Sequence, residues 1–236
     1  MKSIYLLLLL GFLWSCNDEG TTNNETSTTA STVEKAVEKQ EEKISEAASK
    51  EQALLFAVAI EEEKKGALAK AAEIHEKILT INSNYYKSYP VLAGLYSSLG
   101  KKREAIQYGK KALEHNPDDI DLLNTMGMVY LEAGDFANAL SYFNAVIQLN
   151  PRFAYAYNNK GYILLQQEEY DLALLSIEKS LALDMDNAYA YRNAAICYHK
   201  KGEKEACCEA LVAASNAKFR HRLKEELESL KADFCR

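Results

Sequence analysis

The cysteines and histidines are the side chains of this protein that could do chemistry. Apart from Cys16, the cysteines gather toward the C-terminus, at Cys197, Cys207, Cys208 and Cys235. Thiols in an oxidising compartment can form disulfides or take part in redox exchange, and with His199 or His221 they could hold a metal ion. No CxxC or HxxxH spacing occurs, so we expect no metal site. A thiol-based redox or metal-handling protein remains open as the second interpretation.

The histidines do not indicate a catalytic group, because they are spread along the sequence, at His75, His115, His199 and His221. No Ser-His-Asp grouping, phosphate-binding loop or paired carboxylates are evident. We therefore predict no enzyme activity, no catalytic residue, no cofactor and no small-molecule substrate. The formal net charge of −6 argues against a nucleic-acid-binding protein, which needs a basic face to displace counterions from phosphates.

A 34-residue period organises most of the sequence. It relates Gly66, Gly100, Gly134, Glu168 and Gly202. Small side chains recur at two other phases, at Ala71, Ala105, Ala139, Ala173 and Cys207, and at Ala59, Ala93, Gly127, Gly161 and Ala195. Two helices approach closely only where side chains are small, and glycine suits the left-handed conformation that ends a helix. The pattern predicts paired helices joined by tight turns, with strain at Glu168.

These phases resemble the tetratricopeptide repeat family. The match is clearest in two repeats, which carry Tyr89, Leu92, Ala93, Tyr96, Ala105 and Pro117, and Met126, Gly127, Tyr130, Ala139, Phe143 and Pro151. The repeats begin near Gln52, Tyr86, Ile120, Ala154 and Ala188. The resemblance implies an all-α fold, a right-handed superhelical solenoid of five helix-turn-helix repeats over residues 52–221. Leucines at helical spacing then predict a capping helix over residues 222–236.

In this family the first helices of successive repeats line a concave groove. The positions that face the groove include Asn124, Met128, Tyr155, Asn158, Asn159, Tyr162, Tyr189, Arg192 and Asn193, which we predict to bind a protein or peptide partner. Asparagine amides can hold an extended backbone, tyrosines give rigid contact area, and Arg192 could take an acidic group. The alternative is that Asn124, Asn158 and Asn193 bond to neighbouring repeats and serve the fold.

The C-terminal cysteines allow several pairings. The segment 202–235 resembles the terminal repeat common in exported tetratricopeptide proteins of the Bacteroidota, and this resemblance implies a Cys208–Cys235 disulfide. For a turn near Lys218, Cys235 extends past Cys208 by about a helical turn, so the last residues would have to fold back. The alternatives are a Cys197–Cys207 pair, or two buried thiols at these positions.

The N-terminus predicts export and a lipid anchor. Lys2 precedes the apolar run of residues 4–13, which is too short for a comfortable membrane span of about 20 residues. The four residues that end at Cys16 resemble a bacterial lipobox. This implies a signal peptide over residues 1–15 and a lipidated Cys16 in the cell envelope, with the outer membrane favoured and with either a periplasmic or a surface-exposed position. The alternatives are an ordinary cleaved signal with an unmodified Cys16, and an uncleaved signal that serves as an anchor.

Two segments should separate this anchor from the repeats. Residues 16–32 are rich in Thr, Ser and Asn without apolar periodicity, which predicts a disordered tether. Residues 33–51 are rich in Glu, Lys and Ala, with a thin apolar stripe at Val33, Val37, Ile44 and Ala47 or Ala48, which predicts a charged helix. A self-association or partner seam along this stripe is the alternative. The whole pattern favours a noncatalytic, membrane-anchored adaptor.

Overall fold

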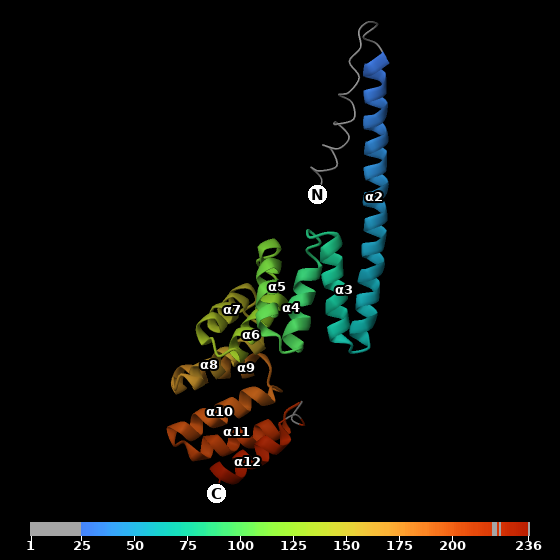
Figure 1. The fold of residues 1–236 in the computed structure, drawn as a ribbon. Coiled ribbons are helices and arrows are strands. Elements are labelled where there is room, and N and C mark those ends of the chain that lie inside the picture. Colours follow the sequence, from blue (N-terminus) through green and yellow to red (C-terminus); the bar gives the residue numbers. More distant parts are fainter. Residues whose placement is uncertain (1–24, 219–220, 222, 236) are drawn as a thin grey trace. The chain divides into compact units, whose positions relative to one another are not determined.

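The computed structural model describes residues 25–218, 221 and 223–235, and no β-strand occurs among them (Figure 1). The helices are α2 (Glu25–Lys64), α3 (Leu68–Ile81), α4 (Ser88–Ser98), α5 (Lys102–His115), α6 (Ile120–Glu132), α7 (Phe136–Leu149), α8 (Ala154–Gln166), α9 (Tyr170–Leu183), α10 (Ala188–Lys201), α11 (Lys204–Asn216) and α12 (Lys224–Phe234). The all-α fold class expected from the sequence is confirmed.

The chain divides into two compact units, Met1–Glu51 and Gln52–Arg236. Helix α2 contributes to both, and it begins at Glu25. Residues 25–32, expected in a disordered tether, are therefore helical here and continue the helix predicted for residues 33–51. The physical reason is that extending a formed helix gains one backbone hydrogen bond for each residue that is ordered, whereas starting a helix is costly.

The remaining N-terminal predictions fall largely outside the described part of the chain. Residues 1–24, which include the predicted signal peptide and Cys16, lie outside it, as do the side chains of Val33, Val37 and Ile44. Of the predicted apolar stripe, Ala47 is exposed and Ala48 is half-buried. The anchor and the seam therefore stay predictions.

In the second unit, consecutive helices pack as pairs. The most extensive packing lies within α4/α5, α6/α7, α8/α9 and α10/α11, and smaller contacts join each pair to the next. The end of α2 packs on α3, where the Phe56 ring meets His75 edge-on with centroids 5.3 Å apart. Helix α12 packs on α11 after the last pair. This is the helix-pair packing of a tetratricopeptide solenoid.

Each turn within a pair contains one residue in the left-handed region. The φ angle is 77° at Gly66, 71° at Gly100, 77° at Gly134 and 79° at Gly202. Glu168 takes the same conformation, with φ of 64°. A side chain at this position costs roughly 1–2 kcal/mol, because its Cβ crowds the following carbonyl oxygen. The strain predicted from the repeat phase is therefore present at Glu168.

The small residues lie where paired helices cross. Ala59, Ala93 and Ala195 are fully buried, as are all five residues of the other small-residue phase. At Gly161 in α8, a methyl group would lie 2.6 Å from Ile177 Cγ1 and 3.0 Å from the Ala173 carbonyl oxygen of α9. The first distance is shorter than real Cβ contacts and the second is at their lower limit, so a side chain at this position would force α8 and α9 to shift.

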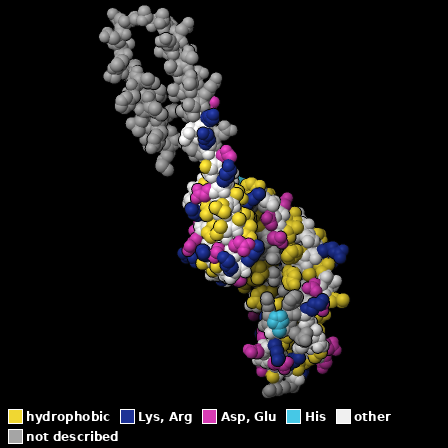
Figure 2. All heavy atoms as spheres, turned by 90° about the vertical axis from the view of Figure 1, so that its right-hand side faces the viewer, with side chains coloured by type: hydrophobic (Ala, Val, Ile, Leu, Met, Phe, Trp, Pro, Cys, Tyr) yellow, Lys and Arg dark blue, Asp and Glu magenta, His cyan; other side chains and the backbone are white. Residues whose placement is uncertain are grey.

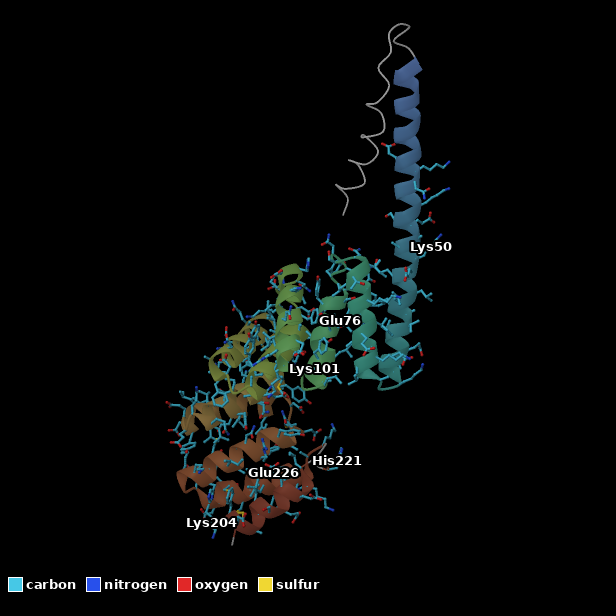
Figure 3. All side chains as sticks on the ribbon, in the orientation of Figure 1. Lys50, Glu76, Lys101, Lys204, His221 and Glu226 are labelled. Carbon is cyan, nitrogen blue, oxygen red and sulfur yellow. A yellow bond between two sulfur atoms is a disulfide. The ribbon has the colours of Figure 1, made fainter. Side chains whose placement is uncertain are left out.

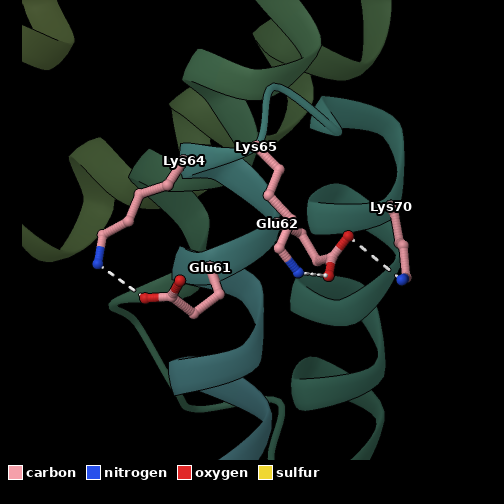
Figure 4. Close-up of polar contacts among 5 residues, drawn as sticks. All are labelled: Glu61, Glu62, Lys64, Lys65 and Lys70. Carbon is pink, nitrogen blue, oxygen red and sulfur yellow. Dashed lines mark hydrogen bonds and ion pairs between the residues drawn. The ribbon is translucent and has the colours of Figure 1, made fainter.

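The first helix pair replaces the usual tyrosine with Glu62. The side chain of Glu62 is largely buried, and its carboxylate forms ion pairs with Lys65 Nζ (2.9 Å) and Lys70 Nζ (3.2 Å) (Figure 4). Nearby, Glu61 forms an ion pair with Lys64. Hydrogen bonds from Lys65 and Lys70 lower the pKa of Glu62 below its usual value. Glu62 therefore remains ionised and links α2 to α3.

The C-terminal cap combines apolar packing with a disulfide. Leu223 and Leu227 are buried in the last core cluster, and the structure joins Cys208 of α11 to Cys235 with Cα atoms 5.8 Å apart. Because α11 ends at Asn216 and α12 begins at Lys224, the turn is centred later than Lys218. With this later turn, Cys235 extends less far past Cys208 than was expected from the sequence, so the two cysteines can pair.

Candidate functional site

The nine residues predicted to bind a partner line one cavity of about 410 Å³. Leu131 is the tenth residue of its lining. Helices α6, α8 and α10, the first helices of three successive pairs, supply all ten side chains. The structure therefore brings the complete predicted set together, with none of its members displaced to another face.

The repeat period explains why these side chains converge. Asn124, Asn158 and Arg192 are each 34 residues apart and so occupy the same position on three successive first helices. Three further pairs with the same separation complete most of the lining: Met128 with Tyr162, Tyr155 with Tyr189, and Asn159 with Asn193. Since each repeat stacks on the next in one orientation, equal phases line one face.

Two asparagines of the cavity connect neighbouring repeats. Asn193 Nδ2 donates to Asn158 Oδ1 over 2.9 Å, and both residues are buried, Asn193 to 1% exposure and Asn158 to 6%. A buried amide without such a partner would be costly. For these two residues the structure thus shows the inter-repeat bond that was the alternative to partner binding. They form the floor of the cavity.

The side-chain amides of Asn124 and Asn159 make fewer or weaker hydrogen bonds. Asn124 Oδ1 is buried and has no hydrogen-bond partner among the described residues. Asn159 Nδ2 donates to Met128 Sδ over 3.3 Å, which is a weak acceptor. An unsatisfied buried oxygen costs free energy, so a donor that entered the cavity and reached Asn124 would be stabilised. These two side chains are suited to hold the backbone of a bound polypeptide.

Arg192 alone among the ten described lining residues carries a charge. Its Nε and Nη2 both donate to Asn193 Oδ1, over 3.2 and 2.8 Å, and its guanidinium lies 5.9 Å from the centre of the Tyr189 ring. Its Nη1 donates to Glu226 Oε1 over 2.9 Å. Figure 3 labels Glu226, which α12 carries.

Sequence reasoning missed Glu226, although a signal for it exists. Glu226 lies 34 residues after Arg192 and so continues the phase of Asn124, Asn158 and Arg192 into α12. The capping helix therefore acts as one more first helix in the array. Extending the period past the fifth repeat would have placed a carboxylate beside Arg192.

A second arrangement that the sequence did not reveal is a Ser-His-Glu contact. His75 Nδ1 lies 3.0 Å from Ser88 Oγ, and Nε2 lies 3.4 Å from Glu63 Oε1. Both His75 and Ser88 are completely buried. Burial lowers the pKa of His75 and outweighs the opposite influence of Glu63, so the imidazole is neutral near pH 7. The group is closed to substrate and links α2, α3 and α4.

The remaining thiols are shielded. Cys197 and Cys207 are unpaired and completely buried. Burial raises the pKa of Cys197 to about 11 and also raises that of Cys207, which disfavours the thiolate needed for redox exchange. Within the described residues, no group of three His, Cys, Asp or Glu side chains could hold a metal ion. No observation on this part of the chain favours a redox or metal-handling role.

One face of the molecule carries mixed charge. On the face shown in Figure 2, Lys and Arg side chains lie among Asp and Glu, with apolar side chains between them. This face therefore presents no electrostatic field of a single sign.

None of the described helices is both long enough and apolar enough to cross a bilayer.

Comparison with known proteins identifies the repeats. Residues 86–119 and 124–188 match family models described as tetratricopeptide repeat, so the chain contains these repeats. No curated protein matches it.

Several solved structures share the fold. A tetratricopeptide repeat protein from Parabacteroides merdae has a TM-score of 0.68 at 20% identity, covering 78% of this chain and 72% of its own. MamA has a TM-score of 0.64 at 20% identity, covering 78% and 94%. YrrB, described as a TPR protein with an unusual peptide-binding site, has a TM-score of 0.61 at 23% identity, covering 74% and 90%. At these identities the likeness concerns the fold alone.

Proposed function

We propose that this protein is a noncatalytic adaptor that holds an extended segment of a protein partner in the cavity of α6, α8 and α10. The observation that carries the proposal is that repeat-equivalent positions on three helices converge on one cavity with both amide and aromatic walls. Tetratricopeptide arrays generally mediate protein-protein interactions and are generally noncatalytic. The peptide-binding site in the description of YrrB, whose fold is similar, agrees with this use of the fold.

The lining suits a polypeptide better than a small polar molecule. Tyr155 is half exposed, and Tyr162 and Tyr189 lie partly buried beside it, so aromatic faces are available at little cost in side-chain entropy. Asn124 Oδ1 has no hydrogen-bond partner but is buried, and Asn159 Nδ2 donates to the weak acceptor Met128 Sδ, so a small rotation of either side chain is needed before its amide can bond to a ligand. Together these groups can bind main-chain amides and pack against apolar side chains of an extended segment.

The proposal includes a lipid anchor at Cys16. The lipobox-like sequence before Cys16 supports it, and acyl chains on that cysteine would partition into a bilayer at about 0.8 kcal/mol per buried methylene. The anchored adaptor would gather its partner at a bacterial membrane, with the outer membrane favoured. Asp18 and Glu19, which follow Cys16 after Asn17, resemble in part the export signals of surface lipoproteins of the Bacteroidota, and both a periplasmic and a surface-exposed position stay open.

Replacing Asn159 and Tyr162 together by Ala should weaken partner binding by about tenfold or more. The pair removes one amide and one aromatic wall, and a loss of about 1.4 kcal/mol corresponds to a factor of ten. Arg192 is not used for this test, because its bonds to Asn193 and Glu226 show that its removal would also disturb the fold. Affinity for the co-purified partner is measured by biolayer interferometry.

The matched control replaces Leu172 and Leu175 of α9 by Ala. These side chains are 51% and 63% exposed and do not line the cavity. The control should bind as the wild type does, and both double variants should unfold at close to the wild-type midpoint. Equal affinity for the cavity variant and the wild type would place the docking surface elsewhere.

A further inference from the structure

We infer that the cavity contains a carboxylate subsite at Arg192, and that Glu226 of the capping helix fills it until an acidic segment of the partner displaces it. The inference rests on the proposed function and specifies the chemistry of the ligand. The occupant is a polypeptide segment with an apolar side chain for the tyrosine wall and a carboxylate, from Asp, Glu or a C-terminus, for the guanidinium.

Charge complementarity identifies the ligand class. Arg192 is the one cation among the described lining residues, and its side chain is 18% exposed, so the charge is partly desolvated and still reachable from the cavity. A guanidinium has five N–H donors in a rigid fork that matches a carboxylate. Asn193 engages Nε and Nη2, which holds the fork in place. The fork is therefore oriented before a ligand arrives.

The internal contact with Glu226 is of a kind that a ligand can replace. Glu226 contributes a single oxygen, Oε1, at 2.9 Å, and its side chain is 44% exposed. A partly exposed ion pair with one hydrogen bond is weak, because water screens the charges and two long side chains must be ordered. A ligand segment that places its carboxylate on Arg192 and its apolar side chain on Tyr189 and Tyr162 would gain contacts that Glu226 lacks.

The backbone of α12 need not move for this exchange. Leu227 is buried in the last core cluster, the Phe234 ring stacks on His199 with centroids 3.6 Å apart, and Cys235 is joined to Cys208. The helix is thus fixed at several points, whereas Glu226 lies on its exposed side. Rotation of one side chain is enough to vacate the guanidinium. Glu226 then acts as an internal competitor for the guanidinium, so the carboxylate of a bound segment must replace this one contact before it can bind Arg192.

The test uses the full mature chain in detergent and fluorescein-labelled nonapeptide pools. Each pool has a central Leu and neutral residues elsewhere, except that one position two residues from the Leu is fixed. This position is Asp in the first pool and Asn in the second, both with amidated C-termini. A third pool repeats the Asn peptides with a free C-terminal carboxylate. Binding is followed by fluorescence polarisation.

The Asp pool should bind about five- to tenfold more tightly than the amidated Asn pool. Glu226→Gln should tighten the Asp pool further by about two- to fivefold and leave the amidated Asn pool unchanged. Glu225→Gln, which removes the same charge from the preceding exposed position of α12, is the matched control and should change neither. Tight binding by the third pool would assign the carboxylate to a chain terminus, and tight binding by the first alone would assign it to a side chain.

Equal binding of all three pools, with no response of any of them to Glu226→Gln, would overturn the subsite while leaving the adaptor function standing. Weaker binding of the Asp pool to Glu226→Gln would also overturn it, because Glu226 would then assist rather than compete. Failure of every pool to bind would instead contradict the proposed function, and the subsite would fall with it. Arg192→Lys keeps the charge without the fork and should reduce the Asp preference. Its unfolding midpoint shows whether the fold is intact.

Discussion

Gly161→Ala should lower the free energy of unfolding by about 1–3 kcal/mol, the usual cost of overpacking a core. The added methyl group would meet Ile177 Cγ1 at 2.6 Å and the Ala173 carbonyl oxygen at 3.0 Å. Ile177 is fully buried, so its side chain has little room to move, and the carbonyl can yield only if the α9 backbone moves. Urea titration followed by circular dichroism measures the change.

Gly94→Ala is the matched control for this prediction. Gly94 lies inside α4, and a methyl group there would meet nothing within 4 Å. Because alanine is the better helix former, by up to about 1 kcal/mol, this variant should be neutral or more stable than the wild type. The same chemical change should therefore destabilise the protein at Gly161 and not at Gly94. If Gly161→Ala proves as stable as Gly94→Ala, the helices do not cross as described.

Cys16→Ser should release the protein from membranes almost completely. A lipoprotein keeps its place through the acyl chains on this cysteine, and one hydroxyl cannot carry the same modification. None of the described helices could substitute as a membrane span. Fractionation after a carbonate wash, followed by immunoblotting, measures the bound share, and mass spectrometry of the N-terminal peptide measures the acylation.

Asn17→Ser provides the control for the anchor, since it makes an equally conservative change at the adjacent residue. This variant should stay with the membrane as the wild type does. Retention of the Cys16→Ser protein after the wash would refute the lipid anchor. An unmodified Cys16 in the mature wild type would support the simple cleaved signal instead.

Periodicity made most of the fold predictable. A residue 34 positions after a turn glycine must adopt the same backbone conformation, which is why the left-handed φ of Glu168 was foreseen despite its side chain. The same logic brought Asn124, Asn158 and Arg192 to one cavity. The position of a residue within the 34-residue period specifies on which face of the array its side chain lies. In a fold built from repeats, this information is sufficient to predict the arrangement of the helices.

Features that do not repeat were not predictable from phase. The contact among Glu63, His75 and Ser88 joins three helices at one point and has no counterpart in later repeats. The direction of an amide is also unspecified, since Asn193 can donate to a partner or to Asn158, and only the structure shows that it donates to Asn158. The start of α2 at Glu25 lies outside the repeats, so no repeat phase could locate it, and the composition of residues 16–32 predicted a tether instead.

Site-specific photo-cross-linking can show whether a partner segment lies in the cavity of α6, α8 and α10. A benzophenone amino acid replaces Tyr155, which is 50% exposed at the cavity, or Leu175, which is 63% exposed on α9. After irradiation in intact cells, mass spectrometry identifies the partner and the segment joined to each position. We expect the probe at Tyr155 to capture one defined segment of one partner and the probe at Leu175 to capture none. Capture of that segment from Leu175, and not from Tyr155, would contradict binding in the cavity.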